Sequence, residues 1–194
     1  MTDSMKTDLH RYLQLGRDAI LWKLEGLSEY DMRRPMTPTA TNLLGIVKHL
    51  TAVELGYFAW TFDRPFPGVV PWAEDGAELN SDMWATADES SDYVIDLYRQ
   101  ICAHSDATIA ELPLDAQGHV PHWPEDRATV TLHRIIVHVI ADMDRHAGHA
   151  DIVRELIDGS VGLTVGNENM APGGEKEWLD FRRRVEDAAR RCAK

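Results

Sequence analysis

Asp142 and three histidines, His138, His146 and His149, share one face of a strongly periodic segment, residues 132–159. At about 100° per residue, the four side chains fall within a helical sector roughly 80° wide. Aliphatic residues recur in the same sector, so these polar groups lie inside an apolar stripe. Burying such groups without partners costs about 1–3 kcal/mol each, and more for an unpaired charge. A bound metal ion is one way to satisfy them.

The spacing of Asp142 and His146 is compatible with a metal site, because side chains four residues apart on a helix can converge on one ion. His49, at the margin of another apolar helix face, is the candidate third ligand. Three protein ligands with an open position are typical of catalytic sites, whereas structural zinc is bound by four. Two imidazoles and a carboxylate suit zinc, nickel or ferrous iron. The alternative is an Asp142–His146 salt bridge in a polar core, and spacing alone does not decide between them.

Four further histidines each have a functional and a structural interpretation. His149 and His138 are either further ligands or partners of the metal site, or hydrogen-bonded residues at the rim of the core. His149 is also the candidate catalytic residue, because an imidazole with an ordinary pKa of about 6.5 can carry a proton near neutral pH. His119 and His122 lie in a proline-containing connector, where they either line a pocket or are solvated.

Several function classes are excluded or disfavoured by the sequence. The formal net charge of −12 argues against nucleic-acid binding, which depends on clustered basic residues. There is no P-loop, dinucleotide glycine motif, HExxH or GxSxG. The start of the chain does not resemble a signal peptide, and no apolar run is long enough for a membrane span. Two isolated cysteines, Cys102 and Cys192, fit a reducing cytoplasm.

Helical periodicity dominates the 194 residues, and no strand-like alternation is found. Helices are expected over residues 5–27, about 41–62, 88 to about 112, 129 or 131 to 159, and about 175–191. Long connectors, residues 63–84 and 113–128, contain prolines and tryptophans. The first connector either forms a lid or packs its tryptophans over the end of the helices. The pattern predicts an all-α protein, an antiparallel four-helix bundle in up-down order with both long connectors at one end.

The chain is expected to form one domain, residues 1–194, with a bundle over about 5–160 and a C-terminal extension over 161–194. The extension carries a short helix in which Trp178, Phe181, Val185 and Ala188 are expected to face inward. The same aromatic residues suggest the alternative of a homodimer interface.

Two segments resemble the DinB-like superfamily: NLLGIVKHLTAVELGYF, which contains His49, and HVIADMDRHAGHADIVRELIDG, which contains Asp142 and His146. The similarity is closest to the branch that includes mycothiol-dependent maleylpyruvate isomerase, and it covers about residues 5–160. It implies a four-helix bundle that binds a divalent metal through His49, Asp142 and His146. Where the family usually has Glu or His, this chain has Asp142, whose carboxylate reaches about 1.5 Å less far than that of glutamate. The isomerase has a separate C-terminal domain, so its substrate is not carried over.

The resemblance implies a metal-dependent thiol S-transferase of a bacterial cytoplasm. A divalent metal, zinc foremost, would hold a small thiol such as mycothiol or bacillithiol as the thiolate, which attacks a small-molecule electrophile. The alternatives are a non-catalytic bundle that binds metal or ligand, and a hydrolase that uses metal-bound hydroxide.

Overall fold

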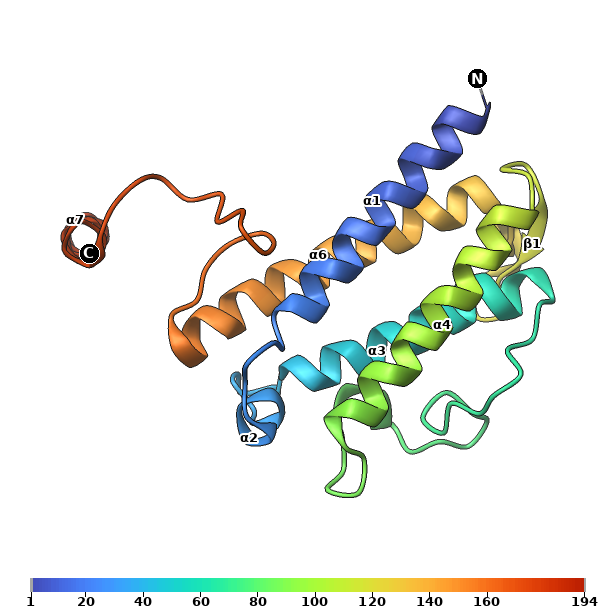
Figure 1. Cartoon of the computed structure of the whole chain (residues 1–194), viewed down its shortest axis with the longest axis horizontal. Coiled ribbons are helices and arrows are strands. Elements are labelled where there is room, and N and C mark those ends of the chain that lie inside the picture. The colour runs from blue at the N-terminus through green and yellow to red at the C-terminus, as the bar shows by residue number, and fades with distance from the viewer. Residues whose placement is uncertain (1, 194) are drawn as a thin grey trace.

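The computed structural model describes residues 2–193, and helices account for most of this span (Figure 1). The long helices are α1 (Thr2–Trp22), α3 (Leu43–Glu54), α4 (Ser91–Glu111) and α6 (Leu132–Asp158). Shorter elements are α2 (Glu29–Arg33), the 3-10 turn η3 (Ser81–Met83) and α5 (Glu125–Ala128), and a further helix, α7 (Glu175–Cys192), follows near the C-terminus. The all-α prediction is confirmed at the level of fold class.

Side-chain caps fix where the long helices begin. Asn42 accepts a hydrogen bond from the backbone N–H of Gly45 at 2.7 Å and starts α3. Ser90 starts α4 and Thr131 starts α6 in the same way. Gly159 ends α6 with φ of 79°, which glycine adopts without steric cost. The expected C-terminal end of α6 is therefore confirmed, and of the two expected starting points the structure has Thr131 rather than Thr129.

The second expected helix changes its winding part of the way along. After Glu54, the chain forms a π-helical turn, η1 (Leu55–Ala59), and then a 3-10 turn, η2 (Trp60–Phe62). A π-helical turn widens the helix locally and changes the direction in which its side chains point. Such turns recur at functional sites, and this one carries Tyr57.

The four long helices do not alternate in direction along the chain. Lys23, just after α1, pairs with Asp151 in the second half of α6, so α1 and α6 run the same way. Arg64, just after η2, pairs with Glu111 at the end of α4, so α3 and α4 also run together (Figure 1). The up-down order, with both connectors at one end, is therefore wrong. Residues 63–90 can return to the other end of α3 because extended chain easily covers the roughly 30 Å of a 20-residue helix.

The expectation of no strands is also wrong, although the sheet is small. Strand β1 (Gln117–His119) pairs antiparallel with β2 (Thr129–Thr131), which leads into α6. Three residues are too few to produce a recognisable alternating pattern in the sequence.

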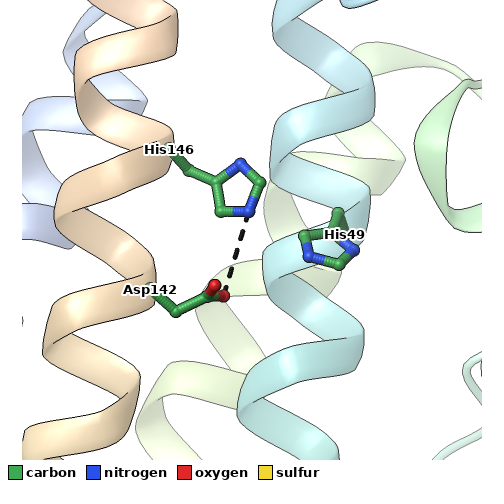
Figure 2. Close-up of side chains that lie close together, drawn as sticks. All are labelled: His49, Asp142 and His146. Atoms are coloured by element: carbon green, nitrogen blue, oxygen red, sulfur yellow. Dashed lines mark ion pairs between the residues drawn. The ribbon is translucent and has the colours of Figure 1, made fainter.

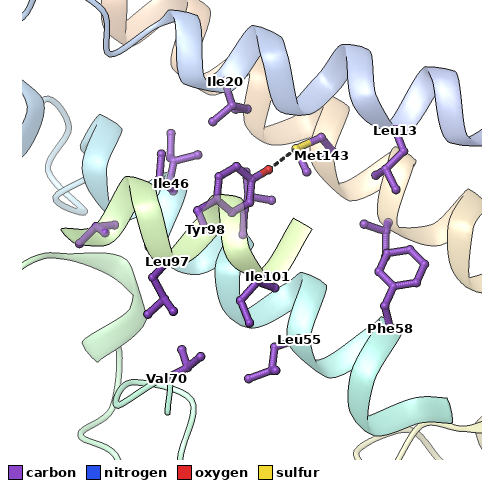
Figure 3. Packing of buried hydrophobic residues seen from close by; sticks show 14 of the residues in the cluster. Leu13, Ile20, Ile46, Leu55, Phe58, Val70, Leu97, Tyr98, Ile101 and Met143 are labelled. Atoms are coloured by element: carbon purple, nitrogen blue, oxygen red, sulfur yellow. Dashed lines mark hydrogen bonds between the residues drawn. The ribbon is translucent and has the colours of Figure 1, made fainter. Parts of the chain in front are cut away.

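One apolar core is shared by α1, α3, α4 and α6 (Figure 3). The side chains shown there include Leu13, Ile20, Ile46, Phe58, Tyr98, Ile101 and Met143. The core also contains a charged pair, because Arg17 of α1 donates two hydrogen bonds of 2.7 Å to the carboxylate of Glu54. Both side chains are almost fully buried. Within residues 2–193, no helix has the length and apolarity that a membrane span requires.

The terminal helix α7 stands apart from the other helices (Figure 1). Phe181 is 48% exposed and Val185 is 53% exposed, and α7 has no buried residue. The inward orientation expected for its apolar residues is therefore wrong. Helical periodicity identifies an apolar face, but it does not say whether another segment covers that face.

Candidate metal centre

Three side chains from α3 and α6 form what we call the histidine–aspartate cluster, namely His49, Asp142 and His146 (Figure 2). Each can offer one ligand atom, and these atoms lie within 4.8 Å of one another. Nε2 of His146 is 3.9 Å from a carboxylate oxygen of Asp142, and the rings of the two histidines are 4.8 Å apart. The expected proximity of His49 to His146 is therefore observed, because the two helices run in opposite directions with these residues at the same level.

The donor set and its spacing fit a divalent metal. Zinc ligands at about 2.0–2.2 Å in a tetrahedral arrangement are roughly 3.4 Å from one another. The observed separations are somewhat longer, so small side-chain rotations are enough to close the cluster around an ion. Two imidazoles and one carboxylate leave at least one position open for another ligand. This arrangement has the form of a catalytic site rather than of a closed structural site.

His146 is held in the neutral state that metal binding requires. Burial lowers its pKa, and the neighbouring His49 lowers it further, while Asp142 acts in the opposite direction. Its second ring nitrogen, Nδ1, is buried and has no hydrogen-bond partner among the described residues. A neutral ring keeps a lone pair on one nitrogen, and Nε2 is the nitrogen that faces Asp142.

Asp82, which the sequence analysis did not identify, fixes the orientation of His49. Its carboxylate accepts a hydrogen bond from Nδ1 of His49 at 2.8 Å. This leaves Nε2 of His49 as the nitrogen available to a metal. Carboxylates that bind the outer nitrogen of a ligand histidine fix the ring and raise its basicity. Asp82 lies in η3 within a long connector, where no periodic pattern could reveal it.

The connector that carries Asp82 is packed firmly against α3. A Cβ atom added to Gly45 would lie 1.9 Å from the backbone oxygen of Met83, so only glycine permits this close approach. Nζ of Lys48 is 2.9 Å from both carboxylate oxygens of Glu89 and 2.8 Å from the backbone oxygen of Trp84. These contacts hold η3 in place beside His49.

Residues 63–84 were expected either to form a lid or to pack their tryptophans over the end of the helices. The contacts of Trp72 distinguish between these two roles. Its indole N–H donates to the backbone oxygen of Lys48 at 3.0 Å, and the Lys48 ammonium lies 4.4 Å from its ring centre. Trp72 is only 6% exposed, whereas Trp84 is 48% exposed. Packing against α3 therefore describes the first part of the connector better than a lid does.

A second group of polar side chains surrounds the hydroxyl of Tyr57. The member from α6 is His138, which precedes Asp142 by about one helical turn. His138 Nε2 is 3.0 Å from this hydroxyl, the indole N–H of Trp123 donates to it at 3.3 Å, and His122 is 3.4 Å away. Burial raises the pKa of Tyr57 and lowers the pKa of His138. Tyr57 therefore keeps its proton and can donate it in a hydrogen bond to neutral His138.

The other candidate histidines are placed in different surroundings. The ring of His149 is exposed and lies 5.5 Å from the ring of His146, on the side of α6 nearer its C-terminus. His119 is exposed in β1. His122 is exposed as well, but it contacts Tyr57, so it is not merely solvated.

Tyr57 was not among the residues predicted from the sequence. The π-helical turn that directs Tyr57 towards α6 has no clear sequence signal.

Comparison with protein families identifies a family to which the chain is similar. The family model described as Mycothiol-S-transferase matches residues 8–159, which reach from the first half of α1 to the end of α6. The span includes the entire histidine–aspartate cluster and Asp82. A comparison with curated proteins gives no match. Because the family model covers most of the chain, the protein belongs to the mycothiol-S-transferase family of the DinB-like superfamily.

Proposed function

We propose that the protein is a metal-dependent transferase that joins a small thiol of the mycothiol type to an electrophilic small molecule. The observation that carries this proposal is the histidine–aspartate cluster, with its open coordination position, in a chain of the mycothiol-S-transferase family. Zinc suits the donor set best, and nickel or ferrous iron also fits it. We further propose that α1, α3, α4 and α6 form the four-helix bundle of the DinB-like fold.

His49, Asp142 and His146 would hold the ion, with Asp82 fixing the ring of His49. The bound ion would lower the pKa of a coordinated thiol so that the sulfur is present as thiolate at neutral pH. His149 lies at the solvent side of His146, where it can accept the thiol proton and release it to water. The chain therefore needs no cysteine of its own for the reaction.

Tyr57 is placed to act on the electrophile. Its hydroxyl is protonated and fixed by Trp123 and His138, and Asp142 is close enough to raise its pKa. A hydroxyl in this position can donate a hydrogen bond to negative charge that develops as sulfur attacks. The sulfur forms the new bond, and the leaving group departs with the electrons of the broken bond.

The proposal is tested on protein purified without chelators. Metal content is measured first, and transfer of mycothiol to monochlorobimane, a thiol-reactive electrophile, is then followed by fluorescence. His146→Ala should abolish metal binding and transfer while helical content is retained, because the core consists mainly of aliphatic residues. Turnover of ester substrates without thiol would favour a metal-dependent hydrolase. Stoichiometric metal without any turnover would instead indicate a binding protein.

A homodimer remains a separate proposal, supported by the exposed apolar residues of α7. The mass in solution at micromolar concentrations tests it.

A further inference from the structure

The apolar residues of α7 have the spacing of a two-stranded coiled coil. They recur alternately three and four residues apart, and we call them the α7 seam: Trp178, Phe181, Val185, Ala188 and Cys192. In this repeat the first and fourth of every seven residues, positions a and d, are apolar and pack against the same positions of another helix. At about 100° per residue, the five side chains fall within a sector roughly 80° wide. The seam is therefore one continuous stripe along the helix.

The rest of the chain does not cover the α7 seam. No seam residue is buried, and Phe181 and Val185 are about half exposed. Both residues line a groove of about 510 Å³, whose lining also includes Glu155 and Gly159 at the end of α6. Packed protein interiors contain few spaces larger than a water molecule, so a groove of this size shows that α6 does not pack against the seam. The seam is therefore accessible to another molecule.

The charges beside the seam fit a second copy of this chain in parallel orientation. Positions e and g flank a coiled-coil seam, and their charges set the choice and the orientation of the second helix. In a parallel pair, each g position lies beside the e position five residues further along the other helix. Glu177 occupies a g position and Arg182 is the e position five residues later, so symmetry produces two ion pairs. The next pair along the seam, Arg184 with Ala189, contains no like charges.

The antiparallel orientation brings like charges together instead. In an antiparallel pair, g positions lie beside g positions and e positions lie beside e positions. When the two seams overlap along their full length, the two-fold axis passes through the middle of the seam. Arg182 then lies near Arg182 of the second copy, and Arg184 lies near its own equivalent. Such like-charge contacts disfavour this orientation.

We propose that α7 pairs with α7 of a second copy as a parallel, in-register coiled coil, held by the α7 seam and by ion pairs between Glu177 and Arg182. The inference rests on the homodimer proposed above and adds its contact surface, its orientation and its register. It does not depend on transfer activity. Stable interfaces typically bury about 1,600 Å². A seam of five residues on each helix is short by this measure, so the dimer should dissociate reversibly on dilution.

The first test measures the mass of the full chain by sedimentation from micromolar to millimolar concentration, in the presence of reductant. Arg182→Glu replaces two attractive contacts with Glu177 by two repulsive ones and should weaken dimerisation by about tenfold. Arg183→Glu is the matched control, because it makes the same charge change on the opposite side of α7 and removes only an exposed pair with Asp180. Its dimerisation should equal that of the wild type. Phe181→Ala should shift the protein to the monomer, because it removes the largest d residue of the seam.

The second test determines the orientation through Cys192, which is exposed at the end of the seam. In a parallel, in-register pair the two Cys192 side chains face each other, so mild oxidation with copper–phenanthroline should link the two copies. Cys192→Ser should remain unlinked, which controls for Cys102. In an antiparallel pair the two Cys192 side chains lie at opposite ends, and no link forms.

The outcomes separate the three proposals. A monomer over the whole concentration range would overturn both the α7 pairing and the homodimer. A dimer that Arg182→Glu and Phe181→Ala leave unchanged, or that forms no Cys192 link, would overturn the α7 pairing while the homodimer stands. A dimer that responds to both variants and forms the link supports the pairing even if no thiol transfer is found, in which case the proposed transferase function alone fails.

Discussion

Asp82 accepts a hydrogen bond from Nδ1 of His49 at 2.8 Å, and this contact joins the connector before α4 to the candidate metal centre. Asp82→Ala should therefore weaken metal binding by about tenfold to hundredfold, the usual effect of removing such a partner. Metal affinity is measured by competition with a chromophoric chelator. Asp75→Ala alters an exposed acid of the same connector and should bind metal like the wild type. Equal affinities in the two variants would show that Asp82 does not orient a ligand.

Gly45 is expected to be intolerant of any side chain. In Gly45→Ala, the new Cβ would collide with the backbone oxygen of Met83 and displace η3 together with Asp82. We expect a loss of about 1–3 kcal/mol in the free energy of unfolding, together with weaker metal binding. Thermal unfolding and metal titration measure the two effects. Gly148→Ala is the matched control, because a Cβ there meets no atom within 4 Å, and it should stabilise α6 slightly.

The length of the Asp142 side chain provides a direct test of its role. Glutamate at this position reaches about 1.5 Å further, so Asp142→Glu should tighten metal binding if the carboxylate is a ligand. The present separation of 3.9 Å between Asp142 and His146 leaves room for this extension. Affinity is measured by competition titration at neutral pH. An unchanged affinity would favour the alternative of a simple Asp142–His146 salt bridge.

The buried pair of Arg17 and Glu54 should behave differently from a surface salt bridge. Glu54→Leu leaves the Arg17 guanidinium buried, with Asp106, at 2.6 Å, as its one remaining anionic partner among residues 2–193. We expect a loss of about 3–5 kcal/mol in the free energy of unfolding, measured by denaturant titration. The double variant Arg17→Met/Glu54→Leu should recover much of this loss, because it removes the unpaired charge. No recovery in the double variant would show that the pair contributes in some way other than charge compensation.

The lowered pKa of Asp158, at the end of α6, predicts that the free energy of unfolding depends slightly on pH. Hydrogen bonds from Arg154 lower its pKa from 3.8 to about 2, although burial acts in the opposite direction. Because the folded-state pKa is depressed, the stabilisation is present above pH 4 and is lost as the pH falls towards 2. The side chain is 34% exposed, so solvent screening limits the effect to less than about 1 kcal/mol. Asp158→Asn should thus lower the Tm at pH 6, and the difference from wild type should shrink by pH 3.

The residues of the candidate site differ in how far the sequence could reveal them. His49, Asp142 and His146 were identifiable because helical periodicity places them on defined faces of two long helices. Asp82 was not, because a connector has no period from which its path can be inferred. The direction of Tyr57 depends on a π-helical turn, which has no clear pattern of its own.

The predicted order of the helices differs from the structure for a related reason. Periodicity gives the length of each helix but not its direction, and a connector as long as residues 63–90 permits either direction for α4. The predicted inward orientation of the apolar residues of α7 is wrong because periodicity does not say what covers a helix face, and Phe181 and Val185 remain about half exposed. Both errors concern relations between elements, whereas the elements themselves were found close to their expected positions.

The crossing path of residues 63–90 has a consequence for refolding. His49, Asp82 and His146 come from segments far apart in the chain, and their contacts require closure of large loops. Non-local contacts of this kind slow folding, whereas individual helices form within microseconds. Helical signal should therefore return well before the capacity to bind metal when denatured protein is diluted into buffer. The candidate metal centre is thus an intrinsic reporter of the last stage of folding.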